Sequence, residues 1–263
     1  MSRRRFLGAA AATLGGVLLA PGVHLIELAR ASAGADAGAS AGEGAGASAG
    51  EGAGASAASG ANPAARWGML IDLNRCVAGC DACVRACNAE NGLDPVPTPT
   101  SAQWLRIVQL EQADTGRRAQ LPVMCQHCAE PPCVDVCPTG ASFKRVDGIV
   151  LVDRHRCIGC RYCMLACPYK ARSFVHAPLA NQRPEVPRGQ GCVEGCTLCV
   201  HRIDRGQYLS ACAEACAQAG HRAIVFGDLN DRSSEIAQRL RELGGSALRA
   251  DLQLHPAVRY QGL

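Results

Sequence analysis

The chain has 263 residues, of which 17 are cysteine, and its formal net charge at neutral pH is +4. A chain of this length forms one large domain or two small ones. The modest charge argues against nucleic-acid binding, which requires a strongly basic face or stripe. The sequence has no run of about 20 apolar residues that would span a bilayer. Its cysteine content far exceeds that of ordinary globular chains, so the function is to be sought in what the cysteines bind.

The first 33 residues have the pattern of an export signal peptide. Ser2–Leu7 reads SRRRFL and resembles the twin-arginine motif S-R-R-x-F-L, and the weakly apolar stretch Phe6–Ala20 follows. That stretch is too short and too rich in alanine and glycine for a membrane anchor. Small residues spaced for cleavage occur at Ala29–Ala31 and Ala31–Ala33. Because the twin-arginine route carries folded proteins, we expect a periplasmic protein that folds before export.

Residues 34–65 consist almost entirely of alanine, glycine, serine and glutamate, and the octapeptide GEGAGASA recurs at Gly42 and Gly50. This composition cannot bury enough apolar surface to offset the entropy of ordering, so we predict a flexible linker. Residues 66–230 contain all the cysteines and are predicted to form the folded domain. Residues 231–263 are predicted to form a surface helix at Ser233–Leu243 and an extended tail.

Sixteen of the cysteines fall into four groups of four. The third group has the spacing C-x2-C-x2-C-x3-C followed by Pro168, which is the run of bacterial ferredoxins. The other groups vary the inner spacing and keep the final C-x3-C, and the first group carries one extra residue. The four groups are Cys76, Cys80, Cys83 and Cys87; Cys125, Cys128, Cys133 and Cys137; Cys157, Cys160, Cys163 and Cys167; and Cys196, Cys199, Cys212 and Cys216.

The spacing has a simple physical basis in iron–sulfur chemistry. Three thiolates close together in the chain bind one face of a [4Fe–4S] cluster. The fourth lies a helical turn further on, points away and binds a second cluster. Four such groups in series predict iron–sulfur clusters. Cys192 is left over, and we interpret it as a free thiol whose nearness to Cys196 makes it a candidate substitute ligand.

Three other interpretations of the cysteines are weaker. Disulfides occur in exported proteins, but paired C-x2-C runs are too close in the chain for useful cross-links, and the cysteine count is odd. Structural zinc uses paired C-x2-C sites but does not explain the C-x3-C-P endings. Cys76, Cys80 and Cys83 match the radical S-adenosylmethionine signature, yet Cys87 follows as a ferredoxin run requires, and no pattern for an α/β barrel surrounds them.

Short apolar runs before two of the groups are typical of strands. They are Met69–Asp72 and Ile149–Asp153. The second run pairs with Ala141–Val146 across an Asp147-Gly148 turn, which predicts a hairpin. We also expect a strand at Trp104–Val108.

The fold class that follows is α+β. We predict tandem bacterial-ferredoxin-like modules, with small hairpins and short helices around iron–sulfur clusters. Each cysteine run leads into a short helical turn, and segments 88–124 and 168–195 are insertions rich in proline and polar residues. Because such modules have thin cores, loss of the clusters should unfold them.

At this level of detail the chain resembles a known family. Cys125–Ala141, His155–Tyr169 and Cys196–Asp204 are similar to the runs of four-cluster iron–sulfur subunits of membrane-bound oxidoreductases. That family includes the electron-transfer subunits of dimethyl sulfoxide, polysulfide and tetrathionate reductases, the relays of hydrogenase-2 and of formate-dependent nitrite reductase (NrfC-like), and the DsrO subunit of the Dsr complex. The resemblance covers Arg66–Asn230. The twin-arginine signal, the split first run and the lack of a C-terminal membrane helix look most like DsrO.

The resemblance implies four [4Fe–4S] clusters whose ligands are exchanged between runs. The chain departs from the family pattern at the extra residue in the first run and at Ala217, where proline is common. The implied ligand sets are Cys76, Cys80, Cys83 and Cys216; Cys196, Cys199, Cys212 and Cys87; Cys125, Cys128, Cys133 and Cys167; and Cys157, Cys160, Cys163 and Cys137.

The resemblance also implies a function without catalytic residues of its own. The chain is expected to be a periplasmic electron-transfer subunit, attached to the membrane through an NrfD-like integral, quinone-interacting subunit. It would relay electrons to or from a multihaem cytochrome in a Dsr-type complex of sulfur metabolism. The alternative is the electron-transfer subunit of a molybdopterin oxidoreductase, such as tetrathionate or polysulfide reductase. A stand-alone enzyme with an open iron site is disfavoured by all-cysteine ligation.

Histidines and arginines near the runs have plainer interpretations. We expect the scattered histidines to be surface residues or neighbours of the cluster ligands, and the arginines to be solvated surface charge. The alternative for the arginines is that they raise the potential of a nearby cluster or dock a partner. The residues concerned are His127, His155, His201 and His221, and Arg85, Arg154, Arg156, Arg161 and Arg202.

Overall fold

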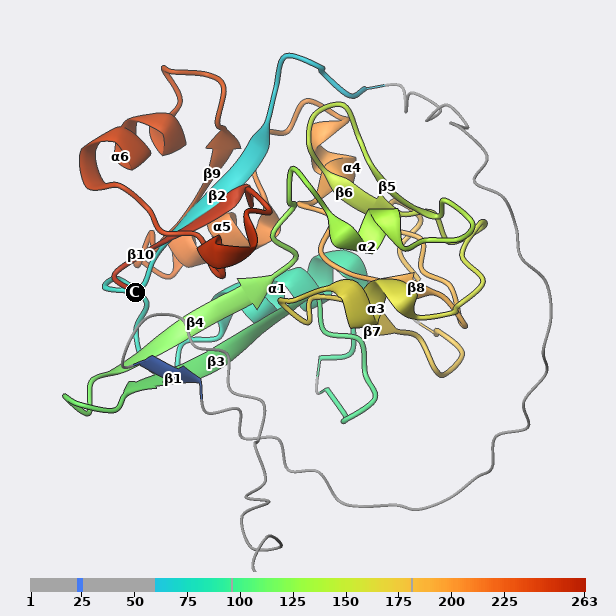
Figure 1. The fold of residues 1–263 in the computed structure, drawn as a ribbon, viewed down its shortest axis with the longest axis horizontal. Coiled ribbons are helices and arrows are strands. Elements are labelled where there is room, and N and C mark those ends of the chain that lie inside the picture. Colours follow the sequence, from blue (N-terminus) through green and yellow to red (C-terminus); the bar gives the residue numbers. More distant parts are fainter. Residues whose placement is uncertain (1–22, 26–59, 96, 181) are drawn as a thin grey trace, which may run out of the picture.

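The computed structural model describes residues 23–25, 60–95, 97–180 and 182–263 (Figure 1). Most of the predicted export signal and residues 34–59 of the predicted linker lie outside the described residues. The strand β1 (Val23–Leu25) pairs antiparallel with β3 (Leu105–Gln112). No helix among the described residues is long and apolar enough to cross a membrane.

A three-stranded sheet brings the two ends of the folded region together. Its middle strand, β2 (Trp67–Asp72), is the strand predicted before the first cysteine run, and all six of its residues are buried. The antiparallel β9 (Ile224–Asp228) flanks β2 on one side, and the parallel β10 (Val258–Gln261) on the other. The segment expected to be an extended tail therefore contributes a core strand, in which Tyr260 is fully buried.

A long hairpin occupies the region that the sequence analysis took as the first insertion. The strand predicted at Trp104–Val108 is confirmed and continues as β3, which pairs antiparallel with β4 (Arg118–Met124). The β4 strand was not predicted, because Pro122 interrupts its pattern. Proline is tolerated there because β4 is an edge strand of its sheet.

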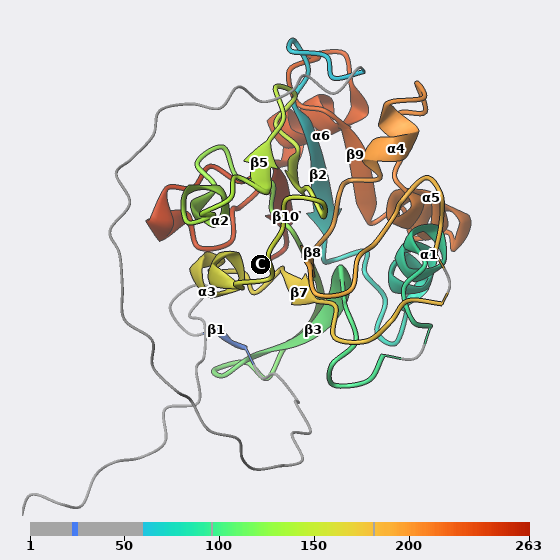
Figure 2. The same cartoon turned by 90° about the vertical axis from the view of Figure 1, so that its right-hand side faces the viewer.

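Two pairs of helices carry cysteines of all four groups. Helix α1 (Ala82–Asn91) packs against α5 (Ala211–Gln218), and the single-turn α2 (Pro132–Asp135) packs against α3 (Tyr162–Ala166). Figure 2 shows the two pairs on opposite sides of β2 and β10. We call the regions around them, with the first and fourth groups and with the second and third groups, the α1/α5 half and the α2/α3 half.

The predicted hairpin lies in the α2/α3 half. Its strands β5 (Ser142–Lys144) and β6 (Val150–Val152) pair antiparallel around the Asp147-Gly148 turn, where Gly148 has a φ of 84°. The helical turns lie within the cysteine runs rather than after them, because α1, α2, α3 and α5 each contain the third cysteine of a run. A further turn, α4 (Val200–Ile203), follows Cys199. Small strands and short helices thus form a small α+β fold.

Elements distant in the sequence are joined by buried ion pairs. Arg145, directly after β5, contacts Asp204 at the end of α4, at 2.7 and 2.9 Å, and also pairs with the fully buried Asp147. The Arg145–Asp204 contact links the α2/α3 half to the segment that follows Cys199. Arg188 pairs locally with Glu194 on β8 (Val193–Glu194), which itself pairs with β7 (Ser173–Phe174), and it also donates to the Gly92 carbonyl oxygen at 2.6 Å, directly after α1.

The remaining elements lie at the C-terminal end. Helix α6 (Glu235–Leu243) forms where a surface helix was predicted, and the Ser234 hydroxyl caps it by accepting a hydrogen bond from the Ala237 N–H. Its Ile236 packs on Leu70 and Val225 of the three-stranded sheet. A short 3-10 turn, η1 (Ala250–Leu252), precedes β10.

Candidate metal centres

In the α1/α5 half, two helices face each other with two cysteines each. Cys83 and Cys87 are four residues apart on α1, as are Cys212 and Cys216 on α5, so each pair lies on one face of its helix. All four are buried. The packing of α1 on α5 therefore brings thiols of the first and fourth groups together.

The pKa shifts record which thiols are neighbours in this half. Burial raises the pKa of Cys83 to about 12, and the neighbouring thiols of Cys212, Cys76 and Cys216 act in the same direction. Burial, followed by Cys212, raises the pKa of Cys199 to about 12.

The other thiols of the α1/α5 half repeat this arrangement. The pKa of Cys76 is raised by burial and then by Cys216 and Cys80. The pKa of Cys196 is raised by burial and then by Cys87 and Cys212. The thiol neighbours of Cys76, Cys83 and Cys196 thus come from both the first and the fourth cysteine groups.

The α2/α3 half brings the second and third groups together in the same way. Burial raises the pKa of Cys128 to about 12, with contributions from Cys125, Cys133 and Cys167. Cys160 differs from the rest, because it alone is exposed among the 17 cysteines, all of which lie in the described residues.

A second thiol of this half shows the opposing effect of a cation. Burial raises the pKa of Cys163 to about 11, and Cys133, Cys137 and Cys157 act in the same direction. The guanidinium of Arg172 lowers it. The crossing between the second and third groups is the counterpart of that between the first and fourth.

Thiols crowded in this way require a positively charged partner. A buried thiolate is disfavoured by desolvation, and each further thiolate nearby adds repulsion. Iron removes both penalties by binding the deprotonated sulfur. The donor set therefore fits [4Fe–4S] clusters. In the part of the chain that the structure describes, no group of three or more His, Cys, Asp or Glu side chains is arranged to hold a single metal ion.

The backbone repeats one conformation in all four groups. The residue directly before the second cysteine of each run has a positive φ, which turns the chain sharply around the site. These residues are Gly79, His127, Gly159 and Leu198, with φ of 81°, 43°, 72° and 53°. At Gly159 a side chain is excluded by space as well, because a Cβ would lie 2.3 Å from the Gly191 carbonyl oxygen.

Backbone N–H groups donate hydrogen bonds to several of the sulfurs. Such bonds favour the charged thiolate and, in iron–sulfur proteins, tune the reduction potential. The donor–sulfur distances are 3.2 to 3.5 Å, for Ser142 to Cys137, Val193 to Cys157, Leu198 to Cys196, Ala211 to Cys199 and Ala223 to Cys216.

Cys192 lies outside the crossing sets. It is buried and its thiol donates to the Arg154 carbonyl oxygen at 3.3 Å, close to Cys157. Its predicted role as a spare thiol stays a prediction.

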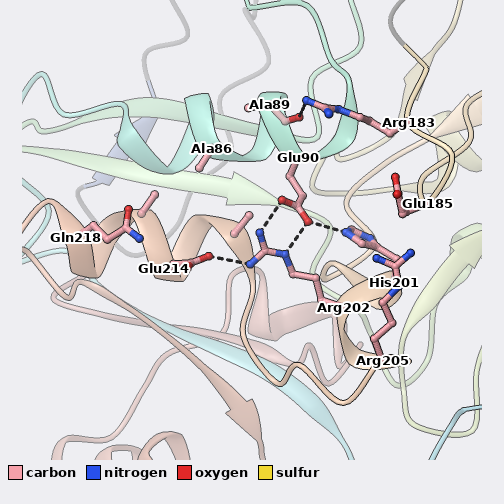
Figure 3. A pocket seen from close by; sticks show the side chains of 12 residues that line it. Ala86, Ala89, Glu90, Arg183, Glu185, His201, Arg202, Arg205, Glu214 and Gln218 are labelled. Carbon is pink, nitrogen blue, oxygen red and sulfur yellow. Dashed lines mark hydrogen bonds and ion pairs between the residues drawn. The ribbon is translucent and has the colours of Figure 1, made fainter.

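A charged network closes the surface side of the α1/α5 half (Figure 3). Glu90 on α1 accepts two hydrogen bonds from Arg202 on α4, both at 2.6 Å, and lies 2.7 Å from His201 Nε2. Arg202 also donates to Glu214 on α5 at 2.8 Å. These residues line a cavity of about 440 Å³. The hydrogen bonds from Arg202 lower the pKa of Glu90 to about 2.

One sequence interpretation is wrong here, that of Arg202, whereas His127 is one of the expected neighbours of the cluster ligands. Arg202 is not solvated surface charge, because its side chain is only 21% exposed and paired with two glutamates. This network is easily missed in the sequence, since Glu90 and Arg202 are 112 positions apart. His127 is a completely buried neighbour of the candidate ligands, and its Nδ1 accepts the Val150 N–H.

Comparison with known proteins agrees with this geometry. Residues 69–141 and 118–228 each match a family model described as a 4Fe-4S dicluster domain. The chain is 42% identical to the Hdr-like menaquinol oxidoreductase iron-sulfur subunit 1 of Archaeoglobus fulgidus, covering 75% of this chain and 84% of the relative. It is 39% identical to a tetrathionate reductase subunit of Salmonella typhimurium, covering 76% and 74%.

A third relative is the menaquinone reductase iron-sulfur cluster-binding subunit of Nitratidesulfovibrio vulgaris, 35% identical over 74% of this chain and 88% of the relative. The two domain matches define the class, a protein that binds [4Fe–4S] clusters through dicluster domains. Within that class, the chain belongs to the family of iron–sulfur subunits of membrane-bound oxidoreductases, as the resemblance predicted.

Proposed function

We propose that this protein is a periplasmic electron-transfer subunit that holds four [4Fe–4S] clusters and leaves substrate chemistry to a partner. The observation that carries the proposal is the crossing of the cysteine groups, first with fourth and second with third. Crossing of this kind is what a ferredoxin run needs, because its fourth cysteine serves the cluster of the other run. Two dicluster domains in one chain support the number four.

The thiol neighbours support the ligand sets that the resemblance implies. Cys76 has Cys80 and Cys216 as neighbours, and Cys87 has Cys212 and Cys199. In the proposal each cluster takes three ligands from one group and one from its partner. The sets are Cys76, Cys80, Cys83 and Cys216; Cys87, Cys196, Cys199 and Cys212; Cys125, Cys128, Cys133 and Cys167; and Cys137, Cys157, Cys160 and Cys163.

When bound, the clusters supply one-electron redox chemistry at potentials that their surroundings adjust. The chain's own residues bury the sulfurs, orient them with positive-φ turns and donate N–H groups to them. Each half buries five of its eight cysteines, but the exposed Cys160 leaves one site of the α2/α3 half near the surface. A redox partner can approach closely there.

For partners, we propose an NrfD-like integral membrane subunit that interacts with quinone, and a multihaem cytochrome in a Dsr-type complex of sulfur metabolism. The relatives named for menaquinol and menaquinone support the quinone side. The SRRRFL motif at Ser2–Leu7 supports twin-arginine export to the periplasm. The chain would then be attached to the membrane peripherally, through its partner.

A second candidate function is the electron-transfer subunit of a molybdopterin oxidoreductase. The 39% identity to the tetrathionate reductase subunit favours it. Co-purification from the native host separates the two functions. A multihaem cytochrome with the chain supports the Dsr-type complex, and a molybdopterin subunit supports the alternative.

The first test is to count iron and acid-labile sulfide in protein matured without oxygen. Four clusters predict about 16 iron and 16 sulfide per chain, with magnetically coupled cubane signals in the EPR spectrum on reduction. Cys192→Ser is the control and should retain all the iron. Bound zinc, or about four iron per chain, would overturn the four-cluster relay.

A further inference from the structure

Arg172 is a buried cation that the sequence analysis did not single out. Its side chain lies in the α2/α3 half and the residue is 7% exposed. Its Nη2 donates to Cys133 Sγ and to the Ser142 hydroxyl, each at 3.2 Å. Within the described residues no carboxylate lies within ion-pair distance of it.

A guanidinium in this position is unusual, because a buried charge is costly unless an opposite charge compensates it. The thiols around Arg172 are the groups that can do so. Burial lowers the pKa of Arg172, but Cys133, Cys125 and Cys163 outweigh this and raise it. Cys133 and Cys125 belong to one proposed ligand set and Cys163 to the other, so the charge of Arg172 acts on thiols of both sets.

The local chain explains how Arg172 reaches this place. Cys167 ends the third run, and Lys170, with a φ of 50°, turns the chain back toward the sulfurs. Arg172 lies five residues after Cys167, as Ser142 lies five residues after Cys137. The two equivalent positions of the repeated runs thus meet in space and hydrogen-bond to each other.

A neighbouring glycine allows close approach of the backbone just before Arg172. A Cβ on Gly195 would lie 2.8 Å from the Ala171 carbonyl oxygen and 3.5 Å from Arg172 Cδ. Any larger residue at position 195 would press on the segment that carries the cation.

We propose that the positive charge of Arg172 raises the reduction potential of the α2/α3 centres, most strongly that of the centre bound through Cys133. The proposal rests on the cluster binding proposed above. One electron added to a [4Fe–4S]²⁺ centre makes its charge more negative, with no bond formed or broken. A fixed positive charge in a low-dielectric site favours that state, and salt screens it little.

The test is an EPR-monitored redox titration of the whole protein, with dithionite as electron donor. Arg172→Gln keeps a hydrogen-bond donor and removes the charge. We expect its equilibrium constant for reduction to fall about tenfold or more at one centre, which is about 59 mV for a one-electron couple. A second centre should shift less, and the other two should stay unchanged. Arg172→Lys retains the charge and should remain within about threefold of the wild type.

A matched control separates this effect from surface charge. Arg156 adjoins Cys157 and is exposed, with its guanidinium bonded to the Thr139 carbonyl oxygen. Arg156→Gln removes the same charge where water screens it, so every potential should stay within about twofold of the wild type. An equal shift in Arg156→Gln and Arg172→Gln would overturn the proposal.

Iron and sulfide counts on the same samples distinguish a failure of the proposed function from a failure of the role proposed for Arg172. A wild type without four clusters refutes the proposed function itself. A fully loaded Arg172→Gln variant with wild-type potentials refutes only the role of Arg172. If Arg172→Gln loses its iron, the fully loaded Arg172→Lys variant decides, since a tenfold fall there shows that the charge does not set the potential.

Discussion

The two halves of the molecule treat an arginine that is shielded from solvent, partly for Arg202 and fully for Arg172, in opposite ways. In the α1/α5 half, Arg202 is neutralised by Glu90 and Glu214. In the α2/α3 half, Arg172 faces sulfur and a hydroxyl, with no ion-pair partner among the described residues. An arginine with two carboxylates stabilises packing, whereas one without them leaves its charge to act on the neighbouring thiolates. The same residue type is therefore structural in one half and electrostatic in the other.

The halves also differ in the exposure of single sulfurs, although each buries five of its eight cysteines. Cys212 lies on the two-turn helix α5 and is 6% exposed, whereas Cys160 lies before the short helix α3 and is exposed. The longer helices of the α1/α5 half provide an apolar scaffold. The shorter helices of the α2/α3 half leave its site open to approach.

The largest expected difference between the halves comes from removing a ligand in each. Cys212→Ala should lose about four iron per chain and destabilise the α1/α5 half, because no water can replace the thiolate there. Cys160→Ala should lose about one iron or less, since solvent can reach the vacant position. Iron analysis and thermal unfolding check this, with Cys192→Ala as control. Equal losses in both variants would contradict the difference in burial.

The next effect concerns the network of the α1/α5 half. Glu90→Gln should lower the free energy of unfolding by about 2 kcal/mol near neutral pH, since it removes charge-assisted hydrogen bonds to Arg202. Denaturant unfolding of the cluster-loaded protein measures it. Glu185 lines the same cavity and forms no ion pair among the described residues, so Glu185→Gln is the control.

The same variant has a defined pH dependence. The folded-state pKa of Glu90 is depressed from 4.5 to about 2, so its contribution is complete above pH 4.5 and is lost as the pH falls toward 2. The difference in stability between wild type and Glu90→Gln should shrink over that window. A constant difference would show that the ion pair is not its source.

A smaller effect is expected where the sheet meets the second cysteine run. The Tyr260 hydroxyl donates to the Pro122 carbonyl oxygen at 3.0 Å and accepts from Gln126 at 3.1 Å, all buried. Tyr260→Phe removes both of these buried hydrogen bonds, although Gln126 keeps its bond to the Met124 carbonyl oxygen, and should reduce stability by about 1.5 kcal/mol in denaturant unfolding. Tyr162→Phe, on an exposed side chain, should have no effect. A neutral Tyr260→Phe would mean that this contact does not couple the sheet to the clusters.

The smallest effect is expected furthest from the sulfurs. Ser234→Ala removes the cap of α6 and should lower stability by about 1 kcal/mol without changing the iron content. Ser233→Ala serves as the control, because its hydroxyl bonds only to the nearby Asp231. Loss of iron in Ser234→Ala would contradict this expectation, because it would show that α6 supports the clusters.

Much of the local structure could be predicted from the residues alone. The strand at Met69–Asp72 and the hairpin around Asp147-Gly148 depend on short-range pattern and turn chemistry. Short helices were expected after the cysteine runs, but they lie within them. The β4 strand escaped prediction because Pro122 breaks its pattern, and the core position of β10 depends on pairing with a strand near the other end of the domain.

Cysteine number and spacing are properties of the sequence, and they are enough to specify the metal chemistry, because a cluster binds whichever thiolates the chain holds at those intervals. The environment of each charge was decided only by the tertiary structure. Arg172 and Arg202 look alike in the chain, since each lies within five residues of a cysteine in a run. Arg202 pairs with two glutamates, whereas Arg172 contacts a cysteine sulfur. The difference arises because burial and charge pairing depend on contacts between segments that are distant in the sequence.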